Sequence, residues 1–281
     1  MPLSPFKEAL DKLRRRLPVG ADLGSSQWAD VPVALRERAF FSARVTNLKI
    51  AQDLKTMAES ILNPIQVQRP DRVTDGNPQG FVTTGENLAS ARTKLKEMLQ
   101  RLGYNPGDKA GTIQDLSSDG RLNLVLKQNV ESAQGFGNFL QGTADGALDV
   151  FPAQELFRAE ERKDERPWPT RWMQAGGQIF GGRMIALKAD PIWEAISAFG
   201  VPWPPFDFNS GMWVRDIGRD EAIELGLLTA EDPAPVPEQK FNDRLQARVE
   251  DIDPDLLASL QQSFGAQFRI ADGIASWTEA A

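Results

Sequence analysis

The sequence predicts an α+β protein, in which a helical N-terminal region precedes a small Trp- and Pro-rich α+β module and a linker-tethered C-terminal helix and tail. Apolar residues recur at helical spacing through the first half of the chain. From about residue 149 the chain changes to short β-like runs with many Pro and Gly, and residues 149–228 hold five of the seven Trp. The expected divisions are therefore a helical region over 1–148, the module over 149–228, a Pro-rich linker over 229–240 and the C-terminal part over 241–281.

Three helices are expected before residue 103, each from its apolar stripe and its end signals. The first covers about residues 5–17, with Ser4 as its N-cap. The second is a single helix over 33–62 with two apolar faces, which would need more than one packing partner. A loop rich in Pro, Gly, Asp and Asn is expected over 63–85. The third helix follows and ends at Gly103.

A fourth helix is expected from about Asp119, and Gly135-Phe136-Gly137 should weaken its last turns. Within the module, β-like composition predicts strands over 155–160, 184–188 and 212–217, with short helices over 190–199 and 219–225. Asp253 and Pro254 begin a C-terminal helix. The apolar residues after it suggest a short ribbon or extended tail that docks on something: Phe268, Ile270, Ile274 and Trp277.

The composition limits the chemistry available to this chain. Among its 281 residues there is no His and no Cys. The usual general base near neutral pH, the thiolate nucleophile and the imidazole or sulfur ligands of zinc, haem and iron–sulfur sites are therefore missing. We expect no enzyme that depends on those residues, no cofactor and no metal site.

The charge and hydropathy of the chain limit its partners. The 32 basic and 39 acidic residues give a net charge of −7, whereas coating duplex DNA requires excess Lys and Arg. DNA contact is therefore expected to be local at most. No apolar run approaches 18 residues, and the first residues lack the layout of a signal peptide. The sequence predicts a protein that is neither membrane-spanning nor secreted, located in the cytoplasm or in an assembly built there.

Two features suggest small-molecule chemistry, and each has a simpler explanation. Gly177 and Gly182 have the separation of a phosphate loop, but Arg183 and Met184 stand where that loop needs Lys and Ser or Thr, which favours a flexible hairpin. Four carboxylates could assemble a catalytic or oxygen-ligand metal site. Capping or solvated carboxylates are the favoured interpretation of these four residues: Asp207, Asp216, Asp220 and Glu221.

The segment over 193–213 is the most unusual, since it contains three Trp, three Phe and three Pro. Such a segment forms either the core of a loop-rich domain or an exposed aromatic docking loop. It contains no Lys or Arg, which argues against stacking of single-stranded nucleic acid. We expect the following residues to anchor the module or to bind a partner: Arg166, Trp168, Trp172, Trp193, Trp203, Phe206, Phe208 and Trp213.

Four segments in this order resemble the minor head or head-morphogenesis proteins of tailed bacteriophages, the Mu-type F-like family. Leu156-Phe-Arg-Ala-Glu-Glu looks like the family's first strand, and Arg166-Pro-Trp-Pro-Thr-Arg-Trp172 stands where its Arg-x-x-His-like segment lies. Trp203-Pro-Pro-Phe-Asp-Phe-Asn-Ser-Gly-Met-Trp-Val214 is similar to its Pro-Pro and Cys-Arg-Cys segment. Residues 219–226 resemble the helix that often comes next.

The sequence also departs from this family. The family's His would fall near Thr170 or Arg171, and its two Cys near Ser210 and Met212. None of the three is present, so any metal-binding role that those residues have in relatives is lost here.

The resemblance implies a non-enzymatic minor head protein of a phage or prophage particle, which would contact portal or capsid proteins during head assembly. Its location would be the virion or the host cytoplasm, and self-association is compatible with the role. Two alternatives stay open. One is a phage-encoded transferase- or hydrolase-like enzyme that uses carboxylates or a Ser–Lys pair. The other is an adaptor that binds another helix through residues 33–62.

Overall fold

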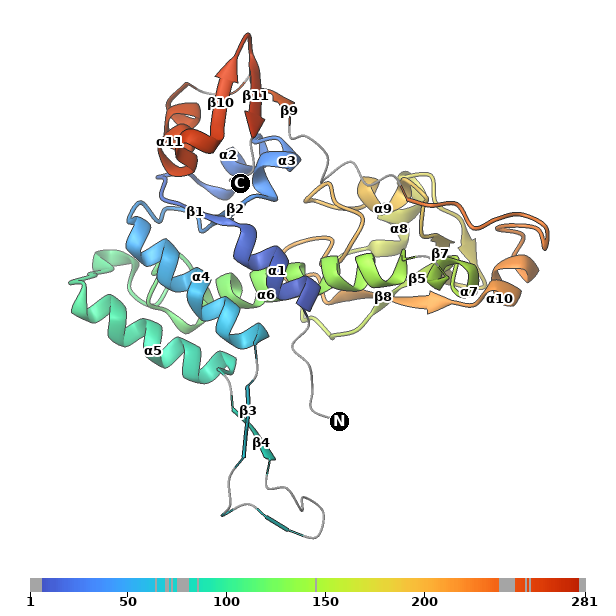
Figure 1. Ribbon diagram of the computed structural model, residues 1–281, viewed down its shortest axis with the longest axis horizontal. Helices are drawn as coiled ribbons and strands as arrows, with labels where there is room; N and C mark the ends of the chain where they lie inside the picture. The colour runs from blue at the N-terminus through green and yellow to red at the C-terminus, as the bar shows by residue number, and fades with distance from the viewer. Residues whose placement is uncertain are drawn as a thin grey trace. The chain divides into compact units, whose positions relative to one another are not determined.

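The computed structural model describes residues 7–63, 65–68, 71, 73, 74, 81–84, 86–144, 146–237, 246–250, 252 and 254–277. It contains both helices and strands, as the predicted α+β class requires (Figure 1). The chain forms two compact units, one of residues 1–133 with 246–281 and one of residues 134–245. Within the described residues, no helix has both the length and the apolar character needed to cross a membrane.

The first unit combines helices with three small sheets. Its helices are α1 (Lys7–Arg15), α2 (Ser25–Ala29), α3 (Val33–Arg36), α4 (Leu48–Leu62), α5 (Leu88–Arg101), most of α6 (Asp119–Gly142) and α11 (Pro254–Phe264). Its strands are β1 (Leu17–Val19), β2 (Ala39–Phe41), β3 (Ile65–Gln68), β4 (Phe81–Thr84), β9 (Gln246–Arg248), β10 (Phe268–Ala271) and β11 (Ile274–Trp277). The pair β1–β2 is parallel, and the pairs β3–β4, β10–β11 and β11–β9 are antiparallel.

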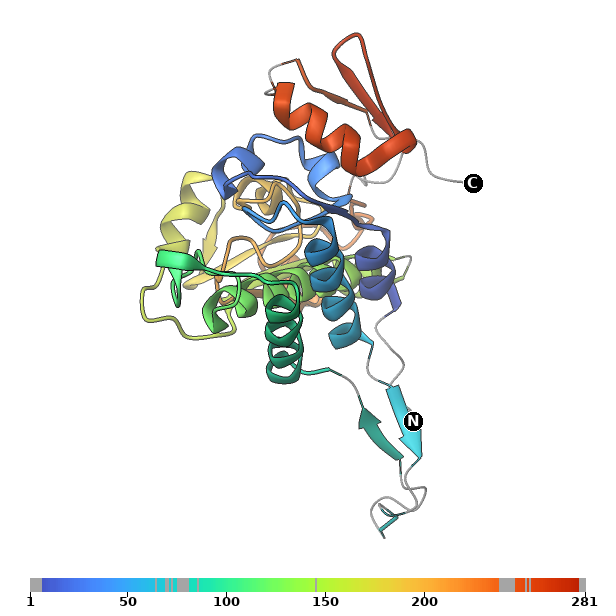
Figure 2. The same cartoon turned by 90° about the vertical axis from the view of Figure 1, so that its left-hand side faces the viewer.

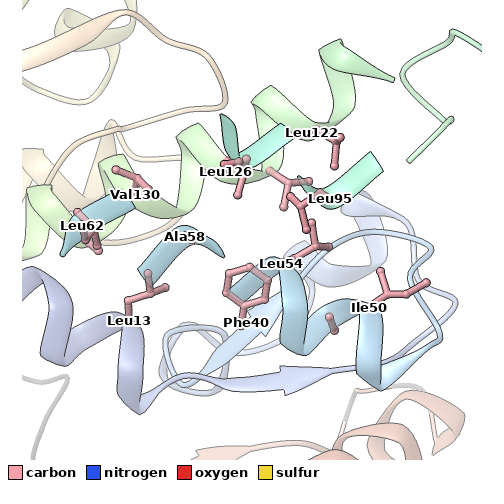
Figure 3. Close-up of a cluster of buried hydrophobic side chains, with 14 of the residues drawn as sticks. Leu13, Phe40, Ile50, Leu54, Ala58, Leu62, Leu95, Leu122, Leu126 and Val130 are labelled. Atoms are coloured by element: carbon pink, nitrogen blue, oxygen red, sulfur yellow. The ribbon is translucent and has the colours of Figure 1, made fainter. Parts of the chain in front are cut away.

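The main core of the first unit lies where α1, α4, α5 and the first turns of α6 meet (Figure 3). Leu13, Phe40, Leu54 and Leu122 are fully buried there. Each lies on the apolar stripe of its element, so burial of these stripes is the main force that orders the helices.

The C-terminal residues pack on the N-terminal strands of the same unit and form a second core. Leu260 and Phe264 of α11, with Phe268 of β10, are buried against Val19 and Leu35. Figure 2 shows α11 beside the hairpin of β10 and β11. The expected C-terminal ribbon is confirmed, and the surface on which it docks belongs to its own chain.

The predicted single helix over 33–62 is wrong. The chain there forms α3, then β2, then α4. Ala39–Phe41 pairs in parallel with Leu17–Val19, and Arg44 has a positive φ of 62° that a helix does not accommodate. Asn47 then caps α4, because its Oδ1 accepts hydrogen bonds from the N–H of Lys49 at 2.9 Å and of Ile50 at 3.3 Å.

Two further expectations for the first half need correction, while the third helix is confirmed as α5. Strands β3 and β4 form an antiparallel hairpin inside the 63–85 segment, which was predicted to be a loop. Ser4 and Asp253, which were expected at the starts of the first and the C-terminal helix, lie outside the described residues. Helix α6 does not weaken at Gly135-Phe136-Gly137 but continues to Gly142.

The second unit is built on one antiparallel sheet with the strand order β6-β7-β5-β8. Its strands are β5 (Ala153–Arg158), β6 (Ile179–Phe180), β7 (Arg183–Leu187) and β8 (Met212–Ile217). Its helices besides the end of α6 are α7 (Ala147–Val150), α8 (Trp168–Gln174), α9 (Ile192–Ala195) and α10 (Arg219–Glu224). The three predicted strands and two predicted helices of the module are therefore confirmed, with ends shifted by a few residues. Gly181 and Gly182 form the two-residue turn between β6 and β7 with φ values of 57° and 87°, which favour glycine in such hairpins.

The compact units divide the chain differently from the predicted domains. The second unit begins at Gln134, inside α6, and includes the predicted linker up to Leu245. The C-terminal part belongs to the first unit, because α11 and β10 share the core of β1 and α3. Sequence spacing alone does not show which earlier segment a C-terminal helix will cover.

Candidate interaction site in the second unit

The aromatic segment contributes Trp193, Ile196, Phe206 and Met212 to the core on one face of the sheet. Trp193, Trp203 and Phe206 are at most 1% exposed. Trp193 contacts Trp172 edge-to-face at 5.2 Å between ring centroids, and its Nε1 donates to the Leu187 carbonyl oxygen at 2.8 Å. The Trp172 Nε1 donates in the same way to the Gln178 oxygen at 2.7 Å. Buried rings with satisfied N–H groups stabilise a fold, so Trp172 and Trp193 are core anchors.

The Pro-rich loop is held against the last turns of α6. The Trp203 ring lies edge-on to Phe136 at 5.0 Å and is tilted against Phe139 at 5.4 Å. A Cβ atom on Gly135 would overlap the carbonyl oxygen of Pro204. Gly135 is therefore needed for close approach of the loop, and it does not act as a helix breaker.

Two arginines of the 166–172 segment contact the aromatic segment over 193–213. Arg171 pairs with Asp207 at 3.0 Å and lies over the Trp168 ring at 4.9 Å. Arg166 pairs with Asp207 at 3.5 Å and donates to the Phe208 carbonyl oxygen at 2.9 Å. Asp207 therefore holds two segments together that are about forty residues apart in the sequence.

Only two of the predicted aromatic residues reach the surface of the second unit. Phe208 is 43% exposed and contacts Phe199 edge-to-face at 4.8 Å. Trp213 is partly exposed on β8. Trp168 and Trp172 are buried in α8.

Sequence reasoning missed an ionic cluster centred on Glu155. The Glu155 side chain is 6% exposed and accepts hydrogen bonds from Arg183 at 2.6 Å and from Arg215 at 2.9 Å. Arg183 also donates to Glu221 at 2.5 Å, and the hydrogen bonds that it donates to Glu155 and then to Glu221 raise the pKa of Arg183 above its ordinary value. Arg215 lies over the Phe157 ring at 5.3 Å. No local signal in the sequence marks this cluster, because its members come from four separate elements, β5, β7, β8 and α10.

A second buried charge, Lys188, was also missed. Its side chain is 4% exposed, and its Nζ lies 2.7 Å from the Asp216 Oδ1 and 3.0 Å from the carbonyl oxygen of Gly142. Gly142 ends α6, so Lys188 satisfies one of the carbonyl groups that a helix leaves without a partner at its C-terminus. These residues border a groove of about 390 Å³ that lies between the end of α6 and strand β8.

The four carboxylates considered for a metal or catalytic site do not form one cluster. Asp207 pairs with arginines, Asp216 with Lys188 and Glu221 with Arg183. Asp220 lies in the first turn of α10, where its negative charge stabilises the positive end of the helix dipole. Among the described residues, no three acidic side chains lie close enough to hold a metal ion together.

Comparisons with known proteins found no matching family model, no matching curated protein and no matching solved structure.

Proposed function

We propose that this chain is a structural minor head protein of a tailed phage or prophage particle, which acts in head assembly by contacts with portal or capsid proteins. The observation that carries the proposal is the meeting of the segments that resemble the family. Leu156 of β5, Trp172 of α8, Phe206 of the Pro-Pro segment and Met212 of β8 are all buried in one core. Segments spread over about sixty residues thus act as one folded module.

The ionic contacts support the same interpretation. Arg171, which stands near the expected position of the family's His, pairs with Asp207 beside the Pro-Pro segment. An ion pair and aromatic packing can hold this segment in place without the metal ligands that the sequence lacks. The surface of the module also offers partly exposed aromatic rings at Phe208 and Trp213, a residue type enriched at protein interfaces.

The enzymatic alternative has less support. Asp207, Asp216 and Glu221 are the carboxylates that such an enzyme would use, and each is paired with a basic side chain. The adaptor alternative depended on an uninterrupted helix over 33–62, which is divided into α3, β2 and α4.

The proposal is tested on particles made by the genome that encodes this chain. We expect the protein to cosediment with purified heads in a few copies, and deletion of its gene to lower the yield of DNA-filled heads. Absence from the heads together with a normal yield after deletion would refute the particle role. The enzymatic alternative is tested with a triple variant, Asp207→Asn, Asp216→Asn and Glu221→Gln. If the parent protein shows catalytic turnover in an activity screen, and the variant loses it but is still incorporated normally into heads, the enzyme is favoured instead.

A further inference from the structure

Among the described residues, the outer edge of β8 has backbone groups without partners. In this part of the chain, strand β8 pairs with β5 on one side only and is the last strand of its sheet. The N–H of Ala159 donates to the carbonyl oxygen of Gly211 at 2.8 Å, so Gly211 faces β5. Residues of an antiparallel strand alternate in direction. Trp213 and Arg215 therefore also bond toward β5, whereas Val214 and Asp216 direct their N–H and C=O groups away from it.

Both of these residues line the groove between β8 and α6. Val214 and Asp216 line it on one side, and Asn138, Phe139 and Gln141 of α6 line it on the other. Within the part of the chain that the structure describes, no hydrogen-bond partner is present for the backbone N–H or C=O of Val214 or Asp216. Unpaired strand edges are templates for a further strand.

The groove also contains a side-chain amide without a protein partner. Gln154 lies opposite Asp216 in the β5–β8 register and lines the groove. The residue as a whole is 7% exposed, but its amide atoms are not enclosed by protein, and no hydrogen-bond partner for them is present among the described residues. The amide can therefore hydrogen-bond to a ligand in the groove.

We propose that the β8 edge binds one extended polypeptide segment of a partner protein, which adds a fifth strand to the sheet. The outward N–H and C=O groups of Val214 and of Asp216 are two residues apart, about 6.8 Å along the strand. This spacing matches the two-residue repeat of an added extended backbone. Successive side chains of the segment would lie beside Trp213 and beside Gln154. The groove is walled by α6 and holds about 390 Å³, so it has room for a single segment and not for the edge of another folded sheet.

Charge contributes little to this recognition. Asp216 is paired with Lys188, and Arg215 with Glu155. The segment should therefore be held by backbone hydrogen bonds and apolar contacts, and its affinity should change little with salt concentration. The inference goes beyond the proposed function and does not depend on it, because binding is measured on the purified chain without particles.

The test uses short linear peptides selected from a random display library against the full-length protein. We expect selected peptides to bind with dissociation constants below roughly 100 µM. Val214→Pro removes the outward N–H while leaving the bonds to β5, and Pro is tolerated on strand edges. This variant should bind at least about tenfold more weakly, whereas Val214→Ala, which shortens the side chain but keeps the N–H, should bind like the parent.

A second measurement does not depend on the folding of a variant. The best peptide is methylated at single backbone nitrogens, one position at a time. Methylation should abolish binding at alternate positions only, since alternate residues of an added strand face β8. The proposal is overturned if no peptide binds the parent protein, if Val214→Pro binds as well as Val214→Ala, or if sensitivity to methylation does not alternate.

Discussion

Glu37 in the first unit shows how burial and ion pairing oppose each other at a single carboxyl group. Its Oε2 lies 2.8 Å from the Nζ of Lys12, and its Oε1 lies 3.3 Å from Nη2 of Arg16. The side chain is 13% exposed. Burial raises the pKa of Glu37, but the charges and hydrogen bonds of Lys12 and Arg16 outweigh it and lower the pKa to about 2.

This pKa predicts acid sensitivity of the first unit. The folded pKa of Glu37 lies below its ordinary value of 4.5, so its stabilisation is present above pH 4.5 and is lost as the pH falls toward 2. At 1.36 kcal/mol per pKa unit, the contribution is at most about 3 kcal/mol. Urea unfolding between pH 7 and pH 2.5 should show Glu37→Gln to be less stable at pH 7 and less dependent on pH than the parent. An unchanged dependence of the free energy of unfolding on pH in Glu37→Gln would contradict this prediction. The control is Glu194→Gln, a substitution at an exposed site.

Burial separates two of the aromatic residues by their expected effect on stability. Trp203 is 1% exposed and packs on Phe136 and Phe139, whereas Phe208 is 43% exposed. Trp203→Ala should therefore destabilise the fold by about 3–5 kcal/mol, and Phe208→Ala by less than about 1 kcal/mol. Thermal and urea unfolding measure both. Equal melting of Trp203→Ala and the parent would show that this ring does not anchor the module.

At the scale of the element, local signals predicted the strands and helices of the second unit well. Strands β5, β7 and β8 alternate apolar and polar residues or carry β-branched and aromatic ones, and these are short-range properties. The prediction of one long helix over 33–62 was wrong because apolar residues at helical spacing also fit a short strand followed by a helix. Phe40 and Phe41 pair with a strand more than twenty residues earlier, and such a pairing is not visible in local periodicity.

The same limit explains which parts of the candidate site were predicted. Trp193, Trp203 and Phe206 are detectable from composition, because large aromatic residues are usually buried. The Glu155 cluster and the Lys188 contacts join residues between 28 and 60 positions apart. Charged side chains are most often solvated, so only the arrangement of the sheet identifies these as buried pairs.

Two glycines of α6 provide a matched test of the loop-to-helix contact. A Cβ at Gly120 would meet only Cδ1 of Ile113 at 3.9 Å, whereas a Cβ at Gly135 would overlap the Pro204 oxygen. Gly120→Ala should be neutral or stabilise the fold by up to about 1 kcal/mol, because Ala favours helix. Gly135→Ala should destabilise it by at least about 1 kcal/mol despite the same gain, since the clash is with backbone. Similar unfolding midpoints for the two variants would contradict the close approach.

At the scale of the whole chain, the first unit is made of two distant parts of the sequence. Residues 1–133 and 246–281 belong to it, and residues 134–245 form the second unit between them. The contact between the two parts is apolar, since Leu260, Phe264 and Phe268 are at most 4% exposed. The chain therefore leaves the first unit at α6 and returns to it at β9, which makes the first unit depend on both ends of the sequence.

This connectivity predicts that the C-terminal part remains attached after the chain is cut. Residues 229–236 are largely exposed, with Val236 at 68%, so a site for a sequence-specific protease inserted there should be cleaved readily. Full burial of a Leu or Phe side chain contributes about 1.5–3 kcal/mol, and three such side chains are buried from this fragment. We expect the fragment to coelute with the remainder of the protein in size-exclusion chromatography at micromolar concentration. Leu260→Asp places a charge in the shared core and should release the fragment after cleavage. Separate elution of the two pieces of the parent protein would show that this core does not hold the two ends together.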